Sequence, residues 1–388
     1  MSTLSSFSFA TVPTILSAPG AARGLGPELR ARFPDIHRIL LVTDQGFLRT
    51  GLADAPVASL REAMFHVEQF ADVLADPPEH VIEDALAQAR QHQTELVIGL
   101  GGGSSMDVAK IVAVLAPGQQ SLAEIYGIGN VRGLRLPLVQ IPTTAGTGSE
   151  VTNISIVTTG ATSKMGIVAP QLYADLAILD AELTLGLPPA VTAATGIDAM
   201  VHAIEAYTSK HKKNPLSDNL ARQALSLLSR HLIRACENGS DLAARQAMLL
   251  GAMLAGQAFA NAPVAAVHAL AYPIGGMFHV PHGLSNSLVL THVLRFNAEA
   301  CAEQYAELAT IVVPHAEGTA EARAEALAVA MQQFAIITGL PRTLRQVGIT
   351  ASDLDLLADD AMKQTRLLGN NPRPVSREDA FAIYQLAL

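Results

Sequence analysis

The chain has 388 residues and a formal net charge of -9 at pH 7, with 49% hydrophobic and only 16% charged residues. A chain of this length is longer than one hydrophobic core usually supports, so we expect two domains. The composition is typical of a helix-rich α/β enzyme. Nucleic-acid phosphates are bound by basic faces, and the acidic balance therefore argues against a nucleic-acid partner.

The N-terminal segment, residues 1–19, carries no formal charge, so a secretory signal peptide has to be considered. It lacks the basic residues that precede the apolar stretch of a signal peptide, and Pro13 interrupts it, so we predict a strand and a turn. Cys236 and Cys301 lie far apart and provide neither a disulfide framework nor a cysteine-based metal motif. Both observations favour a cytoplasmic protein.

Short β-branched runs alternate with helical patterns in the first half of the chain. Strands are predicted at residues 38–44, 95–99 and 136–141, and helices at residues 81–93 and 107–115. This alternation indicates a parallel sheet with helical crossovers, whose ligands lie at the carboxyl ends of the strands. The first of these strands ends at Asp44, which places a carboxylate at that edge.

A glycine-rich loop follows the strand at residues 95–99. Its sequence is Gly101-Gly102-Gly103-Ser104-Ser105-Met106-Asp107. Glycines let the backbone approach a ligand closely, and the positive end of the next helix favours an anion. The spacing is not the Rossmann fingerprint, because Ser104 stands where the third glycine belongs. A structural turn has the same composition, but the strand before and the helix after favour a phosphate-binding loop.

A second loop, residues 142–150, follows the third predicted strand and is rich in hydroxyls and small residues. Such side chains suit a diphosphate or a ribose, although hydroxyls in a Thr/Gly loop also cap helices. Together with the glycine-rich loop, this segment favours ligand binding.

Beyond residues 187–189 the helical period continues with little sign of a strand. Helices are predicted at residues 198–209, 217–236, 242–260 and 319–338, and on to the C-terminus. We place a domain boundary near Gly186, so that residues 1–186 form an α/β domain and residues 187–388 an all-helical domain.

One long segment, residues 246–294, contains no Asp, Glu, Lys or Arg but has four histidines, His268, His279, His282 and His292. Polar residues, prolines and glycines interrupt any apolar stretch of about 20 residues, so a buried helix is favoured over a membrane span. An unpaired buried polar group costs on the order of 1–3 kcal/mol, and a metal ion is one of the few partners that satisfy several imidazoles at once.

A negative charge for such an ion lies upstream, where Asp198 and His202 are four residues apart. In a helix, these two side chains share one face. One carboxylate with up to three imidazoles is a site for a divalent transition metal. The residues alone therefore predict a metal site that contains this pair and takes its further imidazoles from the uncharged segment.

Four motifs in chain order resemble the iron-containing (group III) alcohol dehydrogenases. They are residues 101–110, 142–153 and 196–207, and His268 together with Pro281-His282-Gly283. The resemblance runs nearly the full length of the chain, to residues 371–373. It implies a dinucleotide-binding α/β domain with a mostly parallel sheet, followed by an all-helical metal-binding catalytic domain, as in dehydroquinate synthase.

The family's functional residues carry over to the matching positions of this chain. The resemblance implies that the metal ligands are Asp198, His202, His268 and His282, with Fe2+ as the first choice of ion and Zn2+ as the second. The implied cofactor contacts are Gly102, Gly103, Ser104, Asp107, Thr143, Thr144, Thr147 and Lys164. NAD is the implied cofactor, because Asp44 matches an acidic strand end that binds the adenosine ribose and repels the 2′-phosphate of NADP.

Tyr272 departs from the best-known relatives, which have a histidine four residues after the third ligand. That histidine is a candidate for proton relay, and a tyrosine with an ordinary pKa of about 10 is a poorer acid–base group at neutral pH. We name Tyr272 and the ligand His282 as catalytic candidates, with Tyr272 on the substrate side of the metal. The alternative is a core tyrosine that supports its helix.

The remaining polar residues are assigned simpler roles. We expect His279 to be a polar neighbour of the site and His292 a satisfied structural histidine. Glu205 and Asp218 are expected to be solvated or to cap helices, and residues 210–213 to form a solvated turn.

The sequence thus predicts a metal-dependent NAD(H) alcohol dehydrogenase or aldehyde reductase for a small alcohol or aldehyde. We expect a cytoplasmic homo-oligomer, a dimer or larger, with no membrane or nucleic-acid partner. A glycerol-type polyol dehydrogenase, or a specialised aldehyde or ketone reductase of the same family, is the alternative. A synthase of the dehydroquinate kind is disfavoured, because its acidic substrate needs Lys and Arg around the metal. A non-catalytic metal or nucleotide sensor is the alternative from another class.

Overall fold

The computed structural model describes residues 6–160 and 163–388. These residues form two compact units. One, the α/β unit, comprises Thr11–Leu187 with Ser240–Leu250. The other, the helical unit, comprises Pro188–Gly239 and Gly251–Leu388 together with the described residues before Thr11. The strand and turn predicted for residues 1–19 are present as β1 (Ile15–Ser17) and a following turn, whereas residues 1–5 lie outside the described residues.

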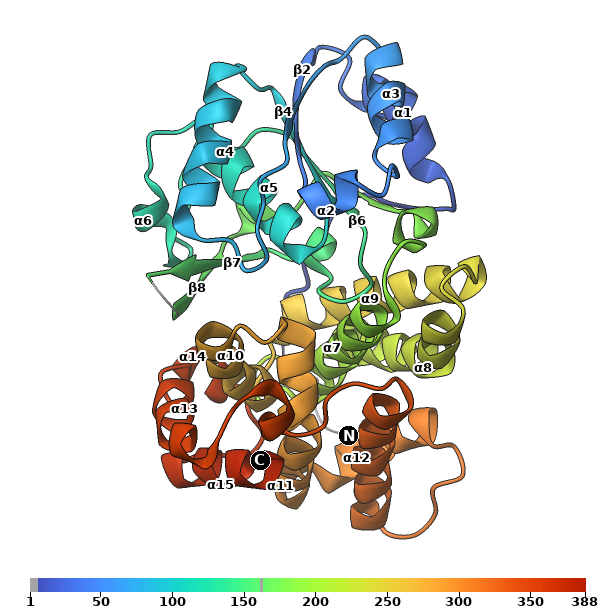
Figure 1. The fold of residues 1–388 in the computed structure, drawn as a ribbon, viewed down its shortest axis with the longest axis vertical. Helices are drawn as coiled ribbons and strands as arrows, with labels where there is room; N and C mark the ends of the chain where they lie inside the picture. The colour runs from blue at the N-terminus through green and yellow to red at the C-terminus, as the bar shows by residue number, and fades with distance from the viewer. Residues whose placement is uncertain (1–5, 161–162) are drawn as a thin grey trace. The chain divides into compact units, whose positions relative to one another are not determined.

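The described residues of the α/β unit form a parallel six-stranded sheet in the order β1–β9–β6–β4–β2–β3 (Figure 1). Its other strands are β2 (Arg38–Val42), β3 (His66–Phe70), β4 (Leu96–Gly101), β6 (Leu138–Pro142) and β9 (Leu176–Leu179). The register pairs Val42 with Gly99 and Gly101 with Pro142. The carboxyl ends of β2, β4 and β6 therefore meet at one edge, as the predicted parallel sheet requires.

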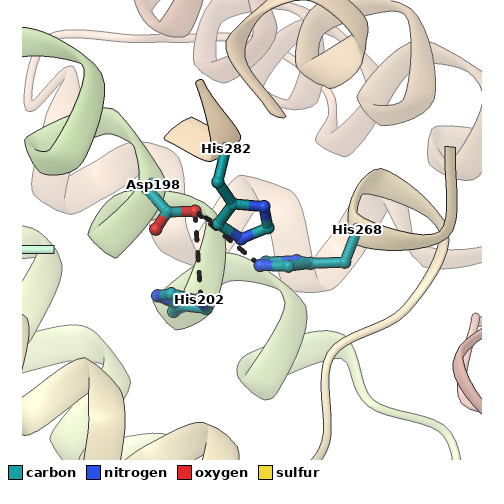
Figure 2. A group of neighbouring side chains, drawn as sticks. All are labelled: Asp198, His202, His268 and His282. Atoms are coloured by element: carbon teal, nitrogen blue, oxygen red, sulfur yellow. Dashed lines mark ion pairs between the residues drawn. The ribbon is translucent and has the colours of Figure 1, made fainter. Parts of the chain in front are cut away.

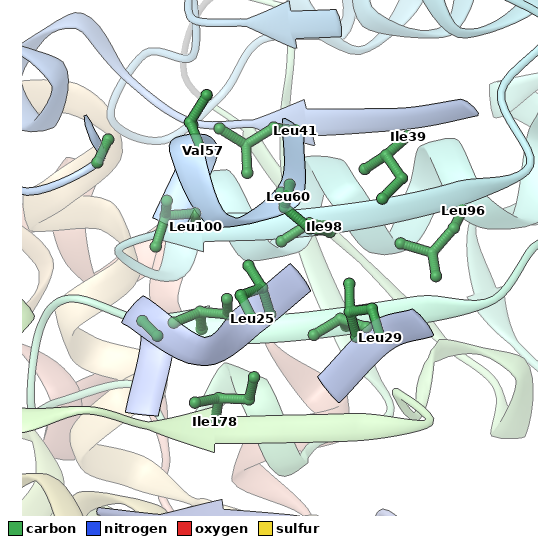
Figure 3. Packing of buried hydrophobic residues seen from close by; sticks show 14 of the residues in the cluster. Leu25, Leu29, Ile39, Leu41, Val57, Leu60, Leu96, Ile98, Leu100 and Ile178 are labelled. Carbon is green, nitrogen blue, oxygen red and sulfur yellow. The ribbon is translucent and has the colours of Figure 1, made fainter. Parts of the chain in front are cut away.

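Helices cover both faces of this sheet (Figure 1). On one face, α1 (Leu25–Arg32) and α3 (Asp54–Glu62) pack against the strands, and Figure 3 shows their apolar side chains interleaved with those of β2 and β4. The fully buried members include Leu25, Leu29, Leu60, Ile39, Leu41, Leu96 and Ile98. The other face carries α4 (Glu79–Gln91) and α5 (Gly103–Leu115). Because both faces are covered, the inner strands β2, β4 and β9 are nearly continuous apolar runs, whereas the edge strand β3 alternates between exposed and half-buried residues.

A close approach between α5 and β4 fixes the start of α5. A Cβ at Gly99 would lie 3.1 Å from the Met106 Cα and 2.3 Å from the Gln140 Oε1. Glycine at this position therefore lets α5 pack directly on the strand. The helix predicted to begin at residue 107 begins at Gly103, so Asp107 lies inside it.

A smaller sheet, β5–β8–β7, completes the α/β unit together with the short helices α2 (Gln45–Leu48) and α6 (Leu122–Ile125). It contains β5 (Gly127–Ile128) and the antiparallel pair β7 (Ile154–Thr159) and β8 (Ser163–Val168). The register places Lys164 opposite Thr158.

The helical unit contains α7 (Pro189–Thr208), α8 (Pro215–Glu237), α10 (Ala266–Phe278), α11 (His282–Val312), α12 (Ala320–Ile337), α13 (Leu354–Ala361), α14 (Thr365–Leu368) and α15 (Arg377–Ala387). Helix α9 comprises Leu242–Asn261, so its first residues belong to the α/β unit and the rest to the helical unit. Pro189 starts α7, where its missing N–H costs nothing, and Asn214 caps α8 by accepting a hydrogen bond from the Ser217 N–H at 3.0 Å. The predicted all-helical character is confirmed.

Nearly every residue of α7 from Thr192 to Thr208 is buried, which is typical of a central core helix. The predicted turn at residues 210–213 is present, with Lys210, His211 and Lys212 exposed. Asp218 lies in the first turn of α8, where its Oδ1 is 2.7 Å from the Lys213 Nζ. No single helix in the described parts of the chain is long and apolar enough to cross a membrane, although α9 and α10, bent by 107°, pass that test as a pair.

Candidate metal centre and cofactor loops

Four side chains of the helical unit point toward one another (Figure 2): Asp198 and His202 from α7, His268 from α10 and His282 from the start of α11. One ligand atom of each lies within 4.8 Å of those of the others. The Asp198 Oδ1 is 4.0 Å from the His202 Nε2, 3.7 Å from the His268 Nε2 and 3.6 Å from the His282 Nε2. Atoms bound to one tetrahedral ion at 2.0–2.3 Å are about 3.3–3.8 Å apart. The distances from Asp198 to His268 and His282 fall in this range, and the distance to His202 is about 0.2 Å longer than its upper limit. These four donors therefore have nearly the spacing, and the chemistry, of a site for one divalent ion.

The local sequence explains why these helices meet. Asp198 and His202 share a face of α7 by their spacing of four residues. His279 ends α10 in the left-handed conformation (φ 54°), and Pro281 caps α11, so the chain reverses between His268 and His282. A Cβ at Gly283 would lie 2.2 Å from the Ala194 carbonyl oxygen. Only glycine allows the start of α11 to approach α7 this closely.

The four residues differ in exposure. Asp198, His202 and His268 are buried, whereas 29% of the His282 side chain is exposed. Burial by itself raises the pKa of Asp198, but the imidazoles of His202, His282 and His268 and the Asn286 amide outweigh burial and hold the pKa below its usual value. The centre is therefore anionic on its buried side and accessible beside His282.

Aromatic rings surround the imidazoles. The His202 ring stacks on the Phe259 ring, with the ring centroids 4.3 Å apart, and on the His268 ring at 4.7 Å. Tyr272 is half-buried, and its ring centroid is 6.0 Å from that of His282. The structure thus places Tyr272 next to the accessible ligand.

Glu205 is not solvated, but it does cap a helix, and it also has a contact with a ligand that was not expected. Glu205 is buried, its Oε2 lies 2.6 Å from the His268 Nδ1, and its Oε1 accepts a hydrogen bond from the Val267 N–H at 2.7 Å. The reason is its position seven residues after Asp198 and three after His202, which puts it on the inward face of α7. That spacing was the available signal in the sequence.

Asn286 is a second residue that the sequence analysis did not single out. It is fully buried, its Nδ2 donates to the Asp198 Oδ1 at 2.6 Å, and it lies 3.3 Å from the His268 Nε2 and 3.4 Å from the His282 Nε2. Its spacing of four residues from His282 was the signal. The other two histidines of the uncharged segment play no such part: His279 is exposed, and burial, then Arg295, lower the pKa of half-buried His292.

In the α/β unit, the two predicted loops lie against each other at the carboxyl ends of β4 and β6. A Cβ at Gly101 would lie 2.5 Å from the Ser105 Oγ, and one at Gly103 would lie 2.8 Å from the Thr147 Cγ2. A Cβ at Gly102 would meet only Thr144, at 3.6 Å. Gly102 caps α5, so its backbone stands at the positive end of that helix, where an anion is favoured.

The other predicted cofactor residues gather near these loops. The Thr143 N–H donates to the Gly101 carbonyl at 2.9 Å. Asp44 follows β2 and caps α2 through its Oδ1, which accepts from the Phe47 N–H at 2.8 Å, while its Oδ2 lies 3.6 Å from the Cβ position of Gly101. Asp44 and both loops therefore share one edge of the sheet.

Lys164 reaches this edge through an aspartate that the sequence analysis missed. The Lys164 Nζ lies 2.7 Å from the Asp76 Oδ1, and the Asp76 N–H donates to the Ser104 Oγ at 3.2 Å. Asp76 has a positive φ of 51°. Nothing in its local sequence pattern marks this contact.

Buried charges hold the two loops together. The Asp107 carboxylate accepts from the Ser149 Oγ at 2.6 Å and from the Ile156 N–H at 2.9 Å. The fully buried Lys110 Nζ donates to the Ser149 Oγ at 2.7 Å and lies 3.7 Å from Asp107. Burial raises the pKa of Asp107, lowers the pKa of Lys110 to about 8 and raises the pKa of Glu150 to about 7.

The fold and the four-residue cluster define a class of proteins that combine a parallel α/β unit with a helical unit containing a candidate metal centre. The iron-containing alcohol dehydrogenase family matches residues 13–181, and the C-terminal part of the Fe-containing alcohol dehydrogenase family matches residues 192–388. The chain belongs to the iron-containing alcohol dehydrogenase family, as its motifs predicted.

Known proteins of this family are similar to this chain over nearly its whole length. The protein is 43% identical over 372 residues to long-chain-alcohol dehydrogenase 1 of Geobacillus thermodenitrificans (strain NG80-2), covering 95% of this chain and 93% of that protein. A crystal structure of 1,3-propanediol oxidoreductase superposes with a TM-score of 0.95 at 34% identity, covering 99% of this chain and 100% of that one. The sulfoacetaldehyde reductase of Bifidobacterium kashiwanohense, solved in complex with NAD+, has a TM-score of 0.87 at 28% identity and covers 99% of both chains. The predicted oxidoreductase class is confirmed.

Proposed function

We propose that the protein transfers hydride reversibly between NAD(H) and a small alcohol or aldehyde whose oxygen is held at the metal centre. The convergence of Asp198, His202, His268 and His282 carries this proposal. Membership of the iron-containing family and the alcohol and aldehyde substrates in the relatives' names support it.

The four donors fit one divalent ion, for which we propose iron, with zinc as the second choice. A bound ion of this kind supplies Lewis-acid polarisation of the substrate oxygen. The chain's own contribution is geometric. Burial excludes water from three of the ligands, and the partial exposure of His282 leaves one side for substrate. Tyr272 beside His282 is suited to donate a hydrogen bond to the substrate oxygen.

On the α/β unit, we propose that the N–H groups of Gly102, Gly103 and Ser104 hold the cofactor diphosphate, with Thr143, Thr144, Thr147 and Lys164 as further contacts. Asp44 is placed to bind the adenosine ribose, which favours NAD over NADP. Asp107 already accepts hydrogen bonds from Ser149 and Ile156, so we propose that it acts by holding the second loop in place. The nicotinamide ring supplies or accepts the hydride.

The proposed division of labour assigns cofactor binding to residues 1–186 and metal-dependent catalysis to residues 187–388. We also propose a cytoplasmic homo-oligomer, a dimer or larger. Cys236 and Cys301 form no disulfide in the described part of the chain, which suits a reducing compartment. The exposed apolar side chains of Ile128 and Leu134 in the α/β unit are candidates for a subunit contact. Light scattering measures the subunit number directly.

The proposal is tested by purifying the protein without oxygen and measuring metal content together with NADH oxidation by a panel of aldehydes and ketones. We expect about one iron or zinc per chain, turnover with NADH in preference to NADPH, and loss of turnover when the metal is removed, with recovery on adding Fe2+. Asp198→Ala should bind neither metal firmly. Stoichiometric ligand binding without turnover of any compound would instead favour the sensor.

A further inference from the structure

We propose that Glu205 is a positioning residue of the metal centre. It holds His268 with the proton on Nδ1, so that the Nε2 lone pair faces the ion, and it fixes the first turn of α10 against α7. The inference rests on the metal centre proposed above, because it assigns the support of one of its ligands.

The contacts of Glu205 determine which nitrogen of His268 carries the proton. The Glu205 Oε2 lies 2.6 Å from the His268 Nδ1, and both side chains are buried. An ionised carboxylate only accepts hydrogen bonds, so the Nδ1 must be the donor. A neutral imidazole then has its lone pair on Nε2, the atom that lies 3.7 Å from the Asp198 Oδ1. Histidines that bind metals are commonly oriented in this way.

The second oxygen of Glu205 holds the backbone of the same helix. The Glu205 Oε1 accepts from the Val267 N–H at 2.7 Å, and Val267 is the second residue of α10. N–H groups in the first turn of a helix have no partner within the helix, and a carboxylate there also opposes the positive end of the dipole. Both oxygens thus bind the start of α10, so displacement of this helix breaks both hydrogen bonds.

One face of α7 therefore supplies two ligands and the support of a third. Asp198, His202 and Glu205 follow one another at spacings of four and three residues. The charges also balance, because a divalent ion with three neutral imidazoles is matched by the two carboxylates of Asp198 and Glu205. Loss of the Glu205 charge would leave the buried centre with an uncompensated positive charge.

The substitution Glu205→Gln keeps the size of the side chain and removes the double acceptor. An amide has one acceptor oxygen and one NH2 donor, so it can serve either the His268 Nδ1–H or the Val267 N–H while its NH2 faces the other donor. Tyr384→Phe is the matched control. The Tyr384 hydroxyl is buried and donates to the Leu270 carbonyl of α10 at 2.7 Å, so its hydrogen bond is to the backbone of this helix and not to a ligand of the centre.

The test measures zinc affinity of the full-length apoproteins by competition with a chromophoric chelator. We expect Glu205→Gln to bind Zn2+ on the order of 10–100-fold more weakly than wild type, and Tyr384→Phe to bind it as wild type does. Equal affinity in Glu205→Gln and wild type, or an equal loss in Tyr384→Phe, would overturn the role of Glu205 while leaving the metal centre intact. A wild-type protein that binds no zinc would refute the metal centre itself.

A second measurement needs no variant. In the zinc-loaded wild-type protein labelled with 15N-histidine, long-range nitrogen–proton spectra report the protonation of each ring nitrogen. We expect His268 to be protonated at Nδ1 and metal-bound at Nε2. Protonation at Nε2 with the metal on Nδ1 would overturn the proposal even if Glu205→Gln does not fold.

Discussion

Replacement of Gly283 by alanine tests how closely the metal centre depends on the approach of α11 to α7. Gly283 follows the ligand His282, and its missing side chain faces the backbone of α7. A Cβ at this position would lie 2.2 Å from the Ala194 carbonyl oxygen and 2.7 Å from its carbonyl carbon. Ordinary van der Waals contact begins at 3.4 Å, so the distance to the oxygen would be more than 1 Å too short. The obstacle is backbone, so α11 rather than a side chain must move.

The size of the expected effect follows from this clash. Over-packing a well-packed interior costs about 1–3 kcal/mol of unfolding free energy. A shift of His282 by about 1 Å away from Asp198 misplaces a metal ligand, for which we expect a loss of turnover on the order of 100-fold. The distance from the His282 Nε2 to the Asp198 Oδ1, now 3.6 Å, would become about 4.6 Å, longer than the distance from Asp198 to any of the three imidazoles in the structure.

Urea unfolding, metal content and NADH oxidation of Gly283→Ala are compared with those of Gly251→Ala. A Cβ at Gly251 would lie 2.9 Å from the Leu228 Cγ, so this control crowds a side chain of the same unit without involving a ligand. We expect the control to keep its metal and its turnover. Full metal content and wild-type turnover in Gly283→Ala would refute the reasoning.

Three further predictions concern other parts of the molecule. Asp44→Gly should raise the kcat/KM for NADPH relative to NADH. Loss of the Asp44 cap of α2 should cost only about a few tenths of a kcal/mol, because glycine is itself tolerated at this position. An unchanged ratio in folded protein would mean that Asp44 does not contact the ribose. Tyr272→Phe should lower turnover about tenfold or less, and Tyr272→His should move the pH–rate profile toward a pKa of about 6–7. Identical pH–rate profiles for wild type and both variants would show that Tyr272 is a core residue that supports its helix. Burial raises the pKa of Glu150 from 4.5 to about 7, so its contribution to the stability of the fold is greatest below pH 4.5, where Glu150 is protonated in both states, and falls as the pH rises through 7. Glu150→Gln cannot ionise and should therefore gain up to about 3 kcal/mol of unfolding free energy relative to wild type across this window. A difference in urea unfolding that does not depend on pH would contradict this prediction.

The parts of the fold that could be predicted are those with a strong local signal. The apolar runs of β2, β4 and β6 and the helices α7, α8, α9 and α12 were recognised, because burial on both faces or on one helical face leaves a direct trace in the sequence. The elements β9, α10 and α11 were not predicted. The β7–β8 pair was not recognised, since its short half-exposed strands resemble a polar loop. The start of α5 was placed too late, because three glycines suppress the helical signal although α5 begins among them.

The residues of the candidate site also divide into those with a local signal in the sequence and those without one. Asp198 and His202 could be paired from their spacing, because both lie on one helix. The partner of Glu205 lies 63 residues away, and only the packing of α10 on α7 brings the two together. The contact between Lys164 and Asp76 spans 88 residues and depends on a left-handed backbone at Asp76. Contacts of this kind arise from tertiary packing and leave no periodic pattern.

The central claim is that Asp198, His202, His268 and His282 bind one catalytic metal ion. Crystals of the iron-loaded protein, measured on both sides of the iron absorption edge, test it most directly. We predict a single anomalous peak within about 2.0–2.3 Å of the Asp198 carboxylate and the three imidazole nitrogens. An active, iron-loaded protein whose anomalous peak lies at other residues, or that shows no peak at these four, would contradict the account.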